Sequence, residues 1–142
     1  MKQILVATHG GMASGIKSSI EILTGLQDKL DVIDAYIDEN DLKQGITKFI
    51  KQLEGTTGVI LTDIIGGSVS QEVLLQVHDQ KNIFVITGVN LPIVLSLVMN
   101  SETLSSESLK RLVDQAQLAV LQPAEGRLQI VGQNDDFFET KS

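Results

Sequence analysis

The chain has 142 residues, of which 42% are hydrophobic, so it can bury the core of one domain and is too apolar to be disordered. Its formal net charge of -7 argues against a nucleic-acid-binding protein, because such proteins present a basic face. The absence of cysteine excludes disulfides, thiolate metal sites and a cysteine nucleophile.

Two further features bear on where the protein acts. No apolar run approaches the roughly 18 residues that a membrane-spanning helix needs. Met1 and Lys2 lead directly into a predicted strand, without the basic start, apolar stretch and cleavage site of a signal peptide. We therefore expect a cytoplasmic protein, which would contribute to any membrane transport only through partners.

Predicted strands and helices alternate through the first half of the chain. Residues 4–7 form a short continuous apolar run, which is typical of a strand buried on both faces of a parallel sheet. After it we predict a helix over 12–26, a strand over 31–36, an acidic loop over 38–41, a helix over 42–53 and a strand over 59–62.

The same alternation continues in the second half. Ser68 and Gln71 fit a capping box, so a helix is predicted from about Ser68 to about His78. Pro92 suits the first turn of another helix. We further predict a strand over 82–87, a helix from 92 to 99, a helix over 107–121 that Pro123 ends, a strand over 127–131 and an acidic tail over 135–139.

This order of elements predicts an α/β fold, with a mainly parallel four-stranded sheet and helices on both faces. Residues 1–122 are expected to form the domain, and residues 123–142 a C-terminal extension of the same single domain. The strand over 127–131 has no helix after it, so we expect it at a sheet edge. Two arrangements stay open: the edge of its own sheet, or exchange into a second copy in a dimer.

Two of the predicted strands end in side chains that could act together. His9 follows the first strand and precedes two glycines, and Asp63 follows the third strand. Ligands of open α/β sheets lie outside the carboxyl ends of the strands, so His9 and Asp63 should converge there if both strands share one parallel sheet. A hydrogen bond from one imidazole nitrogen to Asp63 would fix the tautomer and leave the other nitrogen as a lone-pair nucleophile.

An anion site is predicted beside this pair. Gly66, Gly67 and Ser68 lie at the expected start of a helix, where free amides and the helix dipole favour negative charge. A phosphoryl group fits this site, because its transfer depends mainly on positioning and on neutralising negative charge. The simpler interpretation is a hydrogen-bonded loop histidine at His9, a plain glycine turn and an ordinary helix cap. His78 is interpreted as a polar residue near a helix end.

Three motifs, in this order and at these separations, carry a family resemblance. They are Thr8-His9-Gly10, Thr62-Asp63 with Gly66-Gly67-Ser68, and the Gly-Val-Asn-Leu-Pro sequence of residues 88–92. From Met1 to about Leu121 the chain resembles the mannose-type EIIA domain of the bacterial phosphoenolpyruvate-dependent sugar phosphotransferase system. The resemblance implies a phosphotransferase with a phosphohistidine intermediate.

Within that resemblance, His9 accepts a phosphoryl group from the histidine-containing phosphocarrier protein and passes it to a histidine of an EIIB subunit. Asp63 orients His9, and Gly66, Gly67 and Ser68 form the phosphate cradle, without a cofactor or a metal. The sugar is phosphorylated later, during uptake through membrane EIIC and EIID subunits. The family also implies a homodimer that exchanges a C-terminal strand. Because no EIIB domain follows in the sequence, we expect a free-standing EIIA subunit.

Three rival functions use similar chemistry. A histidine phosphatase or mutase would place an arginine just before the nucleophilic histidine and a second histidine late in the chain, whereas Thr8 precedes His9 and no histidine follows His78. An EIIA-like subunit of a dihydroxyacetone kinase shares the histidine-bearing fold. A regulatory module, whose phosphorylation state alone is read by a partner, would use the same His9. The last two alternatives stay open from the sequence, as does the sugar.

Overall fold

A four-stranded parallel sheet, in the order β2-β1-β3-β4, lies at the centre of the computed structural model, which describes residues 2–37, 41–124 and 127–131. The predicted α/β fold is confirmed. The interior residues of the two central strands are almost completely buried, as the continuous apolar run indicated. The four strands are β1 (Lys2–His9), β2 (Leu30–Ala35), β3 (Thr57–Thr62) and β4 (Ile83–Thr87).

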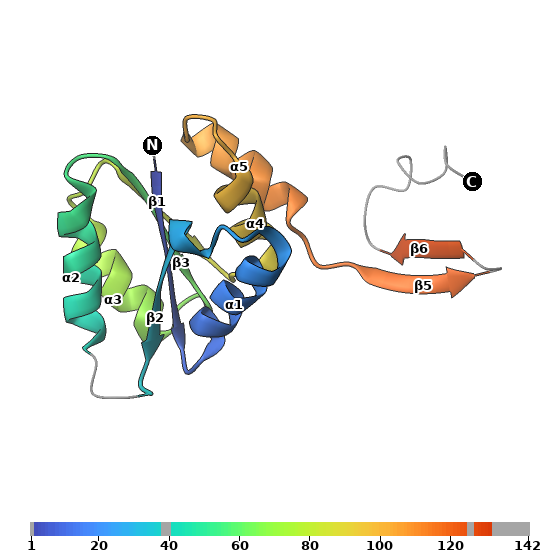
Figure 1. Cartoon of the computed structure of the whole chain (residues 1–142), viewed down its shortest axis with the longest axis horizontal. Helices are drawn as coiled ribbons and strands as arrows, with labels where there is room; N and C mark the ends of the chain where they lie inside the picture. The colour runs from blue at the N-terminus through green and yellow to red at the C-terminus, as the bar shows by residue number, and fades with distance from the viewer. Residues whose placement is uncertain (1, 38–40, 125–126, 132–142) are drawn as a thin grey trace.

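Helices cover both faces of this sheet (Figure 1). On one face α1, α4 and α5 pack against Val6 and Leu61, and on the other α2 and α3 pack against Leu5 and Ile60. Neighbouring strand residues thus enter opposite cores, because side chains alternate along a strand. The helices are α1 (Met12–Thr24), α2 (Leu42–Leu53), α3 (Ser68–Val77), α4 (Leu91–Met99) and α5 (Ser106–Gln115), and the 3-10 turn η1 (Gln27–Lys29) leads into β2.

None of the helices within residues 2–37, 41–124 and 127–131 has the length and hydropathy that crossing a bilayer requires.

The C-terminal part of the chain differs from the sequence-based prediction. The helix predicted over 107–121 is wrong at its end, since α5 stops at Gln115 and Pro123 lies inside the strand β5 (Val120–Ala124). The apolar spacing does continue past Gln115, but the side-chain amide of Asn90 donates to the carbonyl oxygen of Ala116. This tertiary hydrogen bond takes the place of a further helical turn.

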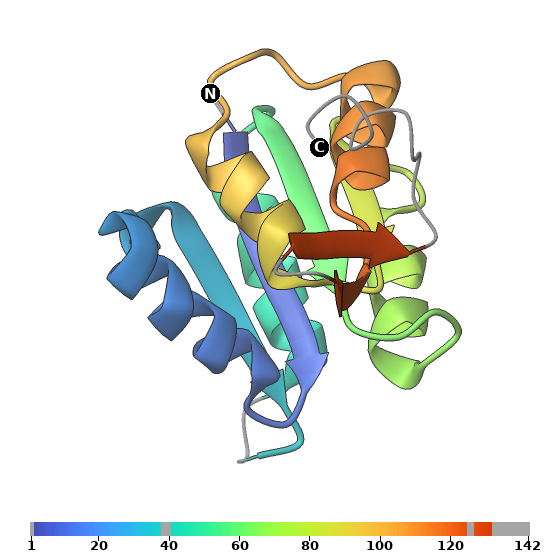
Figure 2. The ribbon, with the colours of Figure 1, turned by 90° about the vertical axis from the view of Figure 1, so that its right-hand side faces the viewer.

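β5 pairs antiparallel with β6 (Arg127–Val131), which confirms the strand predicted over 127–131. Its partner within the described chain is β5, and not the edge of the parallel sheet. The hairpin projects away from the sheet and helices in Figure 1, and it lies nearest the viewer in Figure 2. The expected boundary between residues 122 and 123 falls within β5. Residues 38–40 of the acidic loop and the tail over 135–139 lie outside the described residues.

Candidate functional site

His9 and Asp63 meet at the carboxyl ends of β1 and β3, which are parallel neighbours. The imidazole Nδ1 of His9 lies 2.8 Å from Oδ2 of Asp63, and the backbone N–H of His9 donates to the same oxygen over 2.8 Å. The Asp63 side chain is only 8% exposed, whereas that of His9 is 40% exposed. Asp63 therefore holds one edge of the ring from within the fold and leaves the other edge accessible.

Hydrogen bonds hold Asp63 in its ionised form. Burial of this carboxyl favours the neutral acid, but the hydrogen bonds from the backbone and ring of His9, together with the charge of that ring, outweigh burial and lower the pKa of Asp63 below its ordinary value. The backbone N–H of Ile64 donates to Oδ1 over 2.9 Å. Because a carboxylate only accepts hydrogen bonds, Nδ1 of His9 carries a hydrogen, and in the neutral imidazole Nε2 then presents its lone pair.

The lone pair of Nε2 faces a short chain of hydroxyl groups. Oγ of Ser68 lies 3.2 Å from Nε2 of His9, and the phenol oxygen of Tyr36 lies 2.8 Å from the same Oγ. Since Nε2 accepts, Ser68 donates to it and Tyr36 in turn donates to Ser68. The aromatic ring of Tyr36 is tilted against the imidazole, with 5.4 Å between the ring centroids. His9 is thus bracketed by Asp63 on one edge and by Ser68 and Tyr36 on the other.

The predicted capping box of Ser68 and Gln71 does not form. Gly67 is the N-cap residue of α3, and Ser68 is the first helical residue. The side-chain amide of Gln71 donates to the carbonyl oxygen of Gly66 over 3.1 Å. A serine near a helix start can cap the helix or bond to another group. Here the Ser68 hydroxyl bonds to Nε2 of His9, a contact that the sequence could not show.

The loop before α3 is shaped so that an anion could approach His9. Gly66 has a φ of 75°, which favours glycine. A Cβ on Gly67 would make ordinary contacts, 3.5 Å from Cε1 of His9 and 3.4 Å from the carbonyl oxygen of Ile64, so only a side chain larger than a methyl group would crowd the ring. No side chain among the described residues caps the first turn of α3. Its free amides and the positive end of the helix dipole therefore favour an anion next to Ser68.

Sequence reasoning missed Tyr36. It follows β2 and has a φ of 69°, a left-handed conformation that is unfavourable for a bulky side chain by about 1 kcal/mol or more. β2 pairs with β1, which places this residue beside His9. The sequence predicted Tyr36 as the last residue of a strand over 31–36, but it did not show the strand order that brings this residue to the site.

Two other residues that the sequence analysis named, Asn90 and His78, make no hydrogen bond to His9 in the described part of the chain. Asn90 caps α4 by accepting from the backbone N–H of Ile93 over 3.0 Å, so the motif of residues 88–92 positions a helix. His78 lies at the far end of α3, where Nε2 is 3.2 Å from Asp79. Among the residues that the structure describes, no three or more His, Cys, Asp or Glu side chains are grouped so that they could hold a metal ion.

Fold and site together define a parallel α/β domain whose first strand ends in an exposed histidine, oriented by an aspartate beside a helix N-terminus. A family model described as "PTS system fructose IIA component" matches residues 3–117. The chain therefore belongs to this family of EIIA components of the sugar phosphotransferase system.

Known relatives agree with this membership. The chain is 32% identical over 99 residues to the mannose-specific EIIAB component of Escherichia coli K12, which corresponds to 68% of this chain and 31% of that relative. The mannose/sorbose-specific IIA subunit of Enterococcus faecalis shares the fold with a TM-score of 0.74 at 17% identity, covering 87% of this chain and 98% of the other. A putative sugar phosphotransferase permease from Klebsiella pneumoniae has a TM-score of 0.71 at 24% identity, covering 82% and 90% of the two chains.

Proposed function

We propose that this EIIA component carries a phosphoryl group on Nε2 of His9, between the histidine-containing phosphocarrier protein and an EIIB subunit. One observation supports this most directly: Nδ1 is bonded to Asp63, while Nε2 directs its lone pair toward Ser68 at the start of α3. The imidazole is thereby prepared as a nucleophile, and a site for the transferred anion lies next to it.

In the first half-reaction, the Nε2 lone pair attacks the phosphorus of the donor's phosphohistidine. A new N–P bond forms as the donor's N–P bond breaks, and the electron pair of the broken bond returns to the donor ring. The hydrogen on Nδ1 of His9 stays in its bond to Asp63, and the carboxylate stabilises the positive charge that develops on the ring. The second half-reaction, to a histidine of EIIB, follows the same steps in reverse.

The transferred phosphoryl group takes over the interactions that Nε2 gives up. When the lone pair becomes the N–P bond, the Ser68 hydroxyl loses its acceptor and can donate to a phosphoryl oxygen instead. The first turn of α3, which begins at Ser68 and has no side-chain cap from Gly67, adds its amides and the helix dipole. Tyr36 keeps the Ser68 hydroxyl oriented in both states through its bond to Oγ.

The surface around His9 suits a protein partner. Met12 begins α1, and Ile37, Ile64 and Ile65 lie on the loops that follow β2 and β3; these four residues are 43%, 58%, 59% and 81% exposed. Exposed apolar groups gathered around a reactive residue are typical of a protein interface. We propose that the phosphocarrier and EIIB dock here in turn, in the cytoplasm, and that membrane EIIC and EIID subunits take part only through EIIB.

We further propose a homodimer in which the C-terminal hairpin packs on a partner copy. β4 is an edge strand of the described sheet, and β5–β6 projects from the body of the molecule (Figure 1). Leu118, Val120 and Leu121 are 88%, 64% and 57% exposed, which is unfavourable for an isolated hairpin in water. Light scattering of the full chain should give twice the mass of one chain, and Val120→Asp should lower that mass; a monomeric wild type would refute the dimer.

The transfer itself is tested with purified protein, the phosphocarrier, enzyme I and phosphoenolpyruvate. Intact mass should show one added, acid-labile phosphate in the wild type and in His78→Ala, which removes an exposed histidine away from the site. His9→Ala should show none. An unphosphorylated wild type, in a sample shown to be folded, would refute the proposal. Adding EIIB should discharge the phosphate; a phosphoprotein that EIIB cannot discharge would favour a regulatory module.

A further inference from the structure

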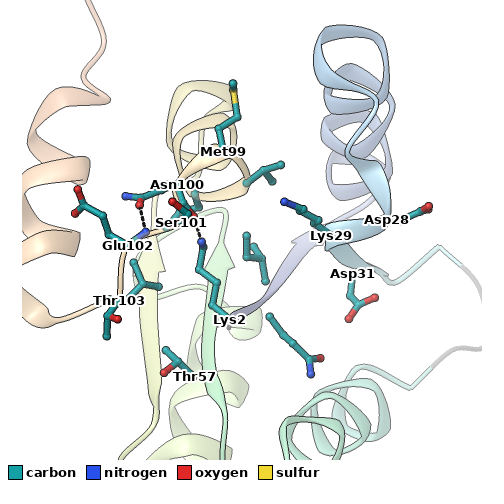
Figure 3. Close-up of a pocket in the computed structure, with 15 residues that line it drawn as sticks. Lys2, Asp28, Lys29, Asp31, Thr57, Met99, Asn100, Ser101, Glu102 and Thr103 are labelled. Carbon is teal, nitrogen blue, oxygen red and sulfur yellow. Dashed lines mark hydrogen bonds between the residues drawn. The ribbon is translucent and has the colours of Figure 1, made fainter.

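A cavity lies at the amino edge of the sheet, at the other end of β1 from His9 (Figure 3). Its volume is about 710 Å³, within the range of small-molecule sites. The starts of β1 and β3, the turn η1 and the loop from α4 to α5 enclose it. β1 has 8 residues, so about 25 Å of strand separates the cavity from His9. A ligand in this cavity would not reach the phosphoryl site.

Two lysine side chains converge on the cavity from different elements. Lys2, at the start of β1, donates from Nζ to the carbonyl oxygen of Asn100. Lys29, at the end of η1, extends toward Lys2 in Figure 3. An ammonium group has three hydrogens, so two donors of Lys2 remain for a ligand. Burial lowers the pKa of Lys2, and the positive charge of Lys29 lowers it further, which shows that the two charges act on each other.

Carboxylates line the cavity but do not compensate this pair. In the described part of the chain, neither Lys2 nor Lys29 lies within 4.0 Å of a carboxylate oxygen. Figure 3 shows the side chains of Asp28 and Glu102 extending away from the space between the lysines. Asp31, the third acidic lining residue, also makes no ion pair with them. Two lysines that line one cavity, without an ion pair to a carboxylate, indicate a place for an anion.

The rest of the lining indicates what kind of anion fits. The hydroxyl-bearing residues Thr57, Ser101 and Thr103 lie on the Lys2 side of the cavity (Figure 3), and the buried residues Ile4 and Leu97 also line it. Two ammonium groups on different sides of one anion match the double charge of a phosphate monoester better than a single carboxylate. Hydroxyl groups along the wall suit a ligand that itself carries hydroxyls.

We propose that this cavity binds a small phosphorylated sugar, with its phosphate between Lys2 and Lys29 and its hydroxyl groups directed to Ser101 and Thr103. The site is distinct from the His9 site, and its ligand is an effector and not a phosphoryl donor. The proposal does not depend on phosphoryl transfer by His9.

The test is a titration of the untagged, ¹⁵N-labelled full chain with fructose 6-phosphate, followed by amide chemical shifts. Shifts should appear at residues 28–31 and 100–104. Fructose should leave these amides unchanged, and inorganic phosphate should move them more weakly. Shifts confined to residues 66–70 would show that only the anion site near His9 is filled, and would overturn the proposal, as would equal binding of fructose.

Variants then test the residues that the proposal assigns. Combined Lys2→Met and Lys29→Met should weaken fructose 6-phosphate binding roughly tenfold, because two charged contacts are lost. The matched control is Lys48→Met with Lys51→Met on α2, which should bind as the wild type does. Unchanged binding in the first pair would overturn the proposal.

A second variant leaves the lysines in place, in case their loss disturbs the fold. Ser101→Ala with Thr103→Val should weaken fructose 6-phosphate binding while inorganic phosphate binding stays the same. Loss of both ligands, or of neither, would contradict the assigned roles of these hydroxyls.

Discussion

Replacing Asp63 with Asn should impair phosphoryl transfer while leaving the chain folded. In the wild type, Oδ2 accepts from both the backbone N–H and the ring Nδ1 of His9, and Oδ1 accepts from the backbone N–H of Ile64. An amide offers one acceptor oxygen and one NH₂ group, so at least one of these donors would face another donor. The tautomer of His9 would no longer be fixed, and the positive ring would lose its counter-charge.

The size of the effect follows from the geometry. With about 4 Å between the charge centres, two unit charges interact by about 4 kcal/mol at an effective dielectric constant of about 20. The His9 side chain is 40% exposed, and solvent screening reduces this by roughly half, to about 2 kcal/mol. A transition state raised by that amount slows transfer about 30-fold.

Rapid-quench measurement of phosphate incorporation gives this rate, and ¹⁵N shifts of the imidazole give the tautomer. Asp34→Asn is the matched control, because Asp34 lies near the end of the neighbouring strand β2 and its carboxylate accepts from Ser14. The wild type and this control should show hydrogen on Nδ1, and Asp63→Asn should show a mixture. Transfer by Asp63→Asn at the wild-type rate would refute the role given to this carboxylate.

The same carboxylate should make stability depend on pH. Folding lowers the pKa of Asp63, so its stabilising contribution is complete above the unfolded value of about 3.9 and is lost as pH falls through the folded value. In urea unfolding, the difference in the free energy of unfolding between the wild type and Asp63→Asn should therefore be largest at neutral pH. This difference should become smaller below about pH 4. A difference that grows in acid would contradict the direction of the pKa shift.

Three other substitutions test the neighbours of His9, each by rapid-quench transfer and urea unfolding. Ser68→Ala should slow transfer about tenfold, because about 1–2 kcal/mol of hydrogen bonding to the ring and phosphoryl group is lost, while stability holds because this hydroxyl is not the helix cap. Tyr36→Phe should slow transfer roughly fivefold through the freed Ser68 hydroxyl, and an unchanged rate would show that the phenol is dispensable. Gly67→Leu should slow transfer about tenfold, because the side chain beyond its Cβ would displace the imidazole, whereas Gly67→Ala, whose Cβ makes only ordinary contacts, should not.

The helix caps show why local sequence was only partly sufficient. Pro92 lies in the first turn of α4, as predicted, because its missing N–H and fixed φ suit that position in almost any surroundings. The sequence allowed Ser68 either to cap α3 or to bond to a side chain far along the chain. In the structure its hydroxyl contacts His9, which lies 59 positions away. The prediction for the end of α5 was wrong for the same reason, since Asn90, the cap residue of α4, donates to the carbonyl oxygen of Ala116.

The amino-acid sequence by itself determined the alternation of strands and helices, because apolar periodicity encodes which faces are buried, and it determined that His9 and Asp63 follow buried strands. Only the tertiary structure decided the strand order, which brings Asp63 and Tyr36 to opposite sides of His9. It also decided the hairpin of β5 with β6, and the cavity at the opposite edge that both Lys2 and Lys29 line. Periodicity is a property of neighbours along the chain, whereas these contacts depend on the packing of segments that the sequence separates.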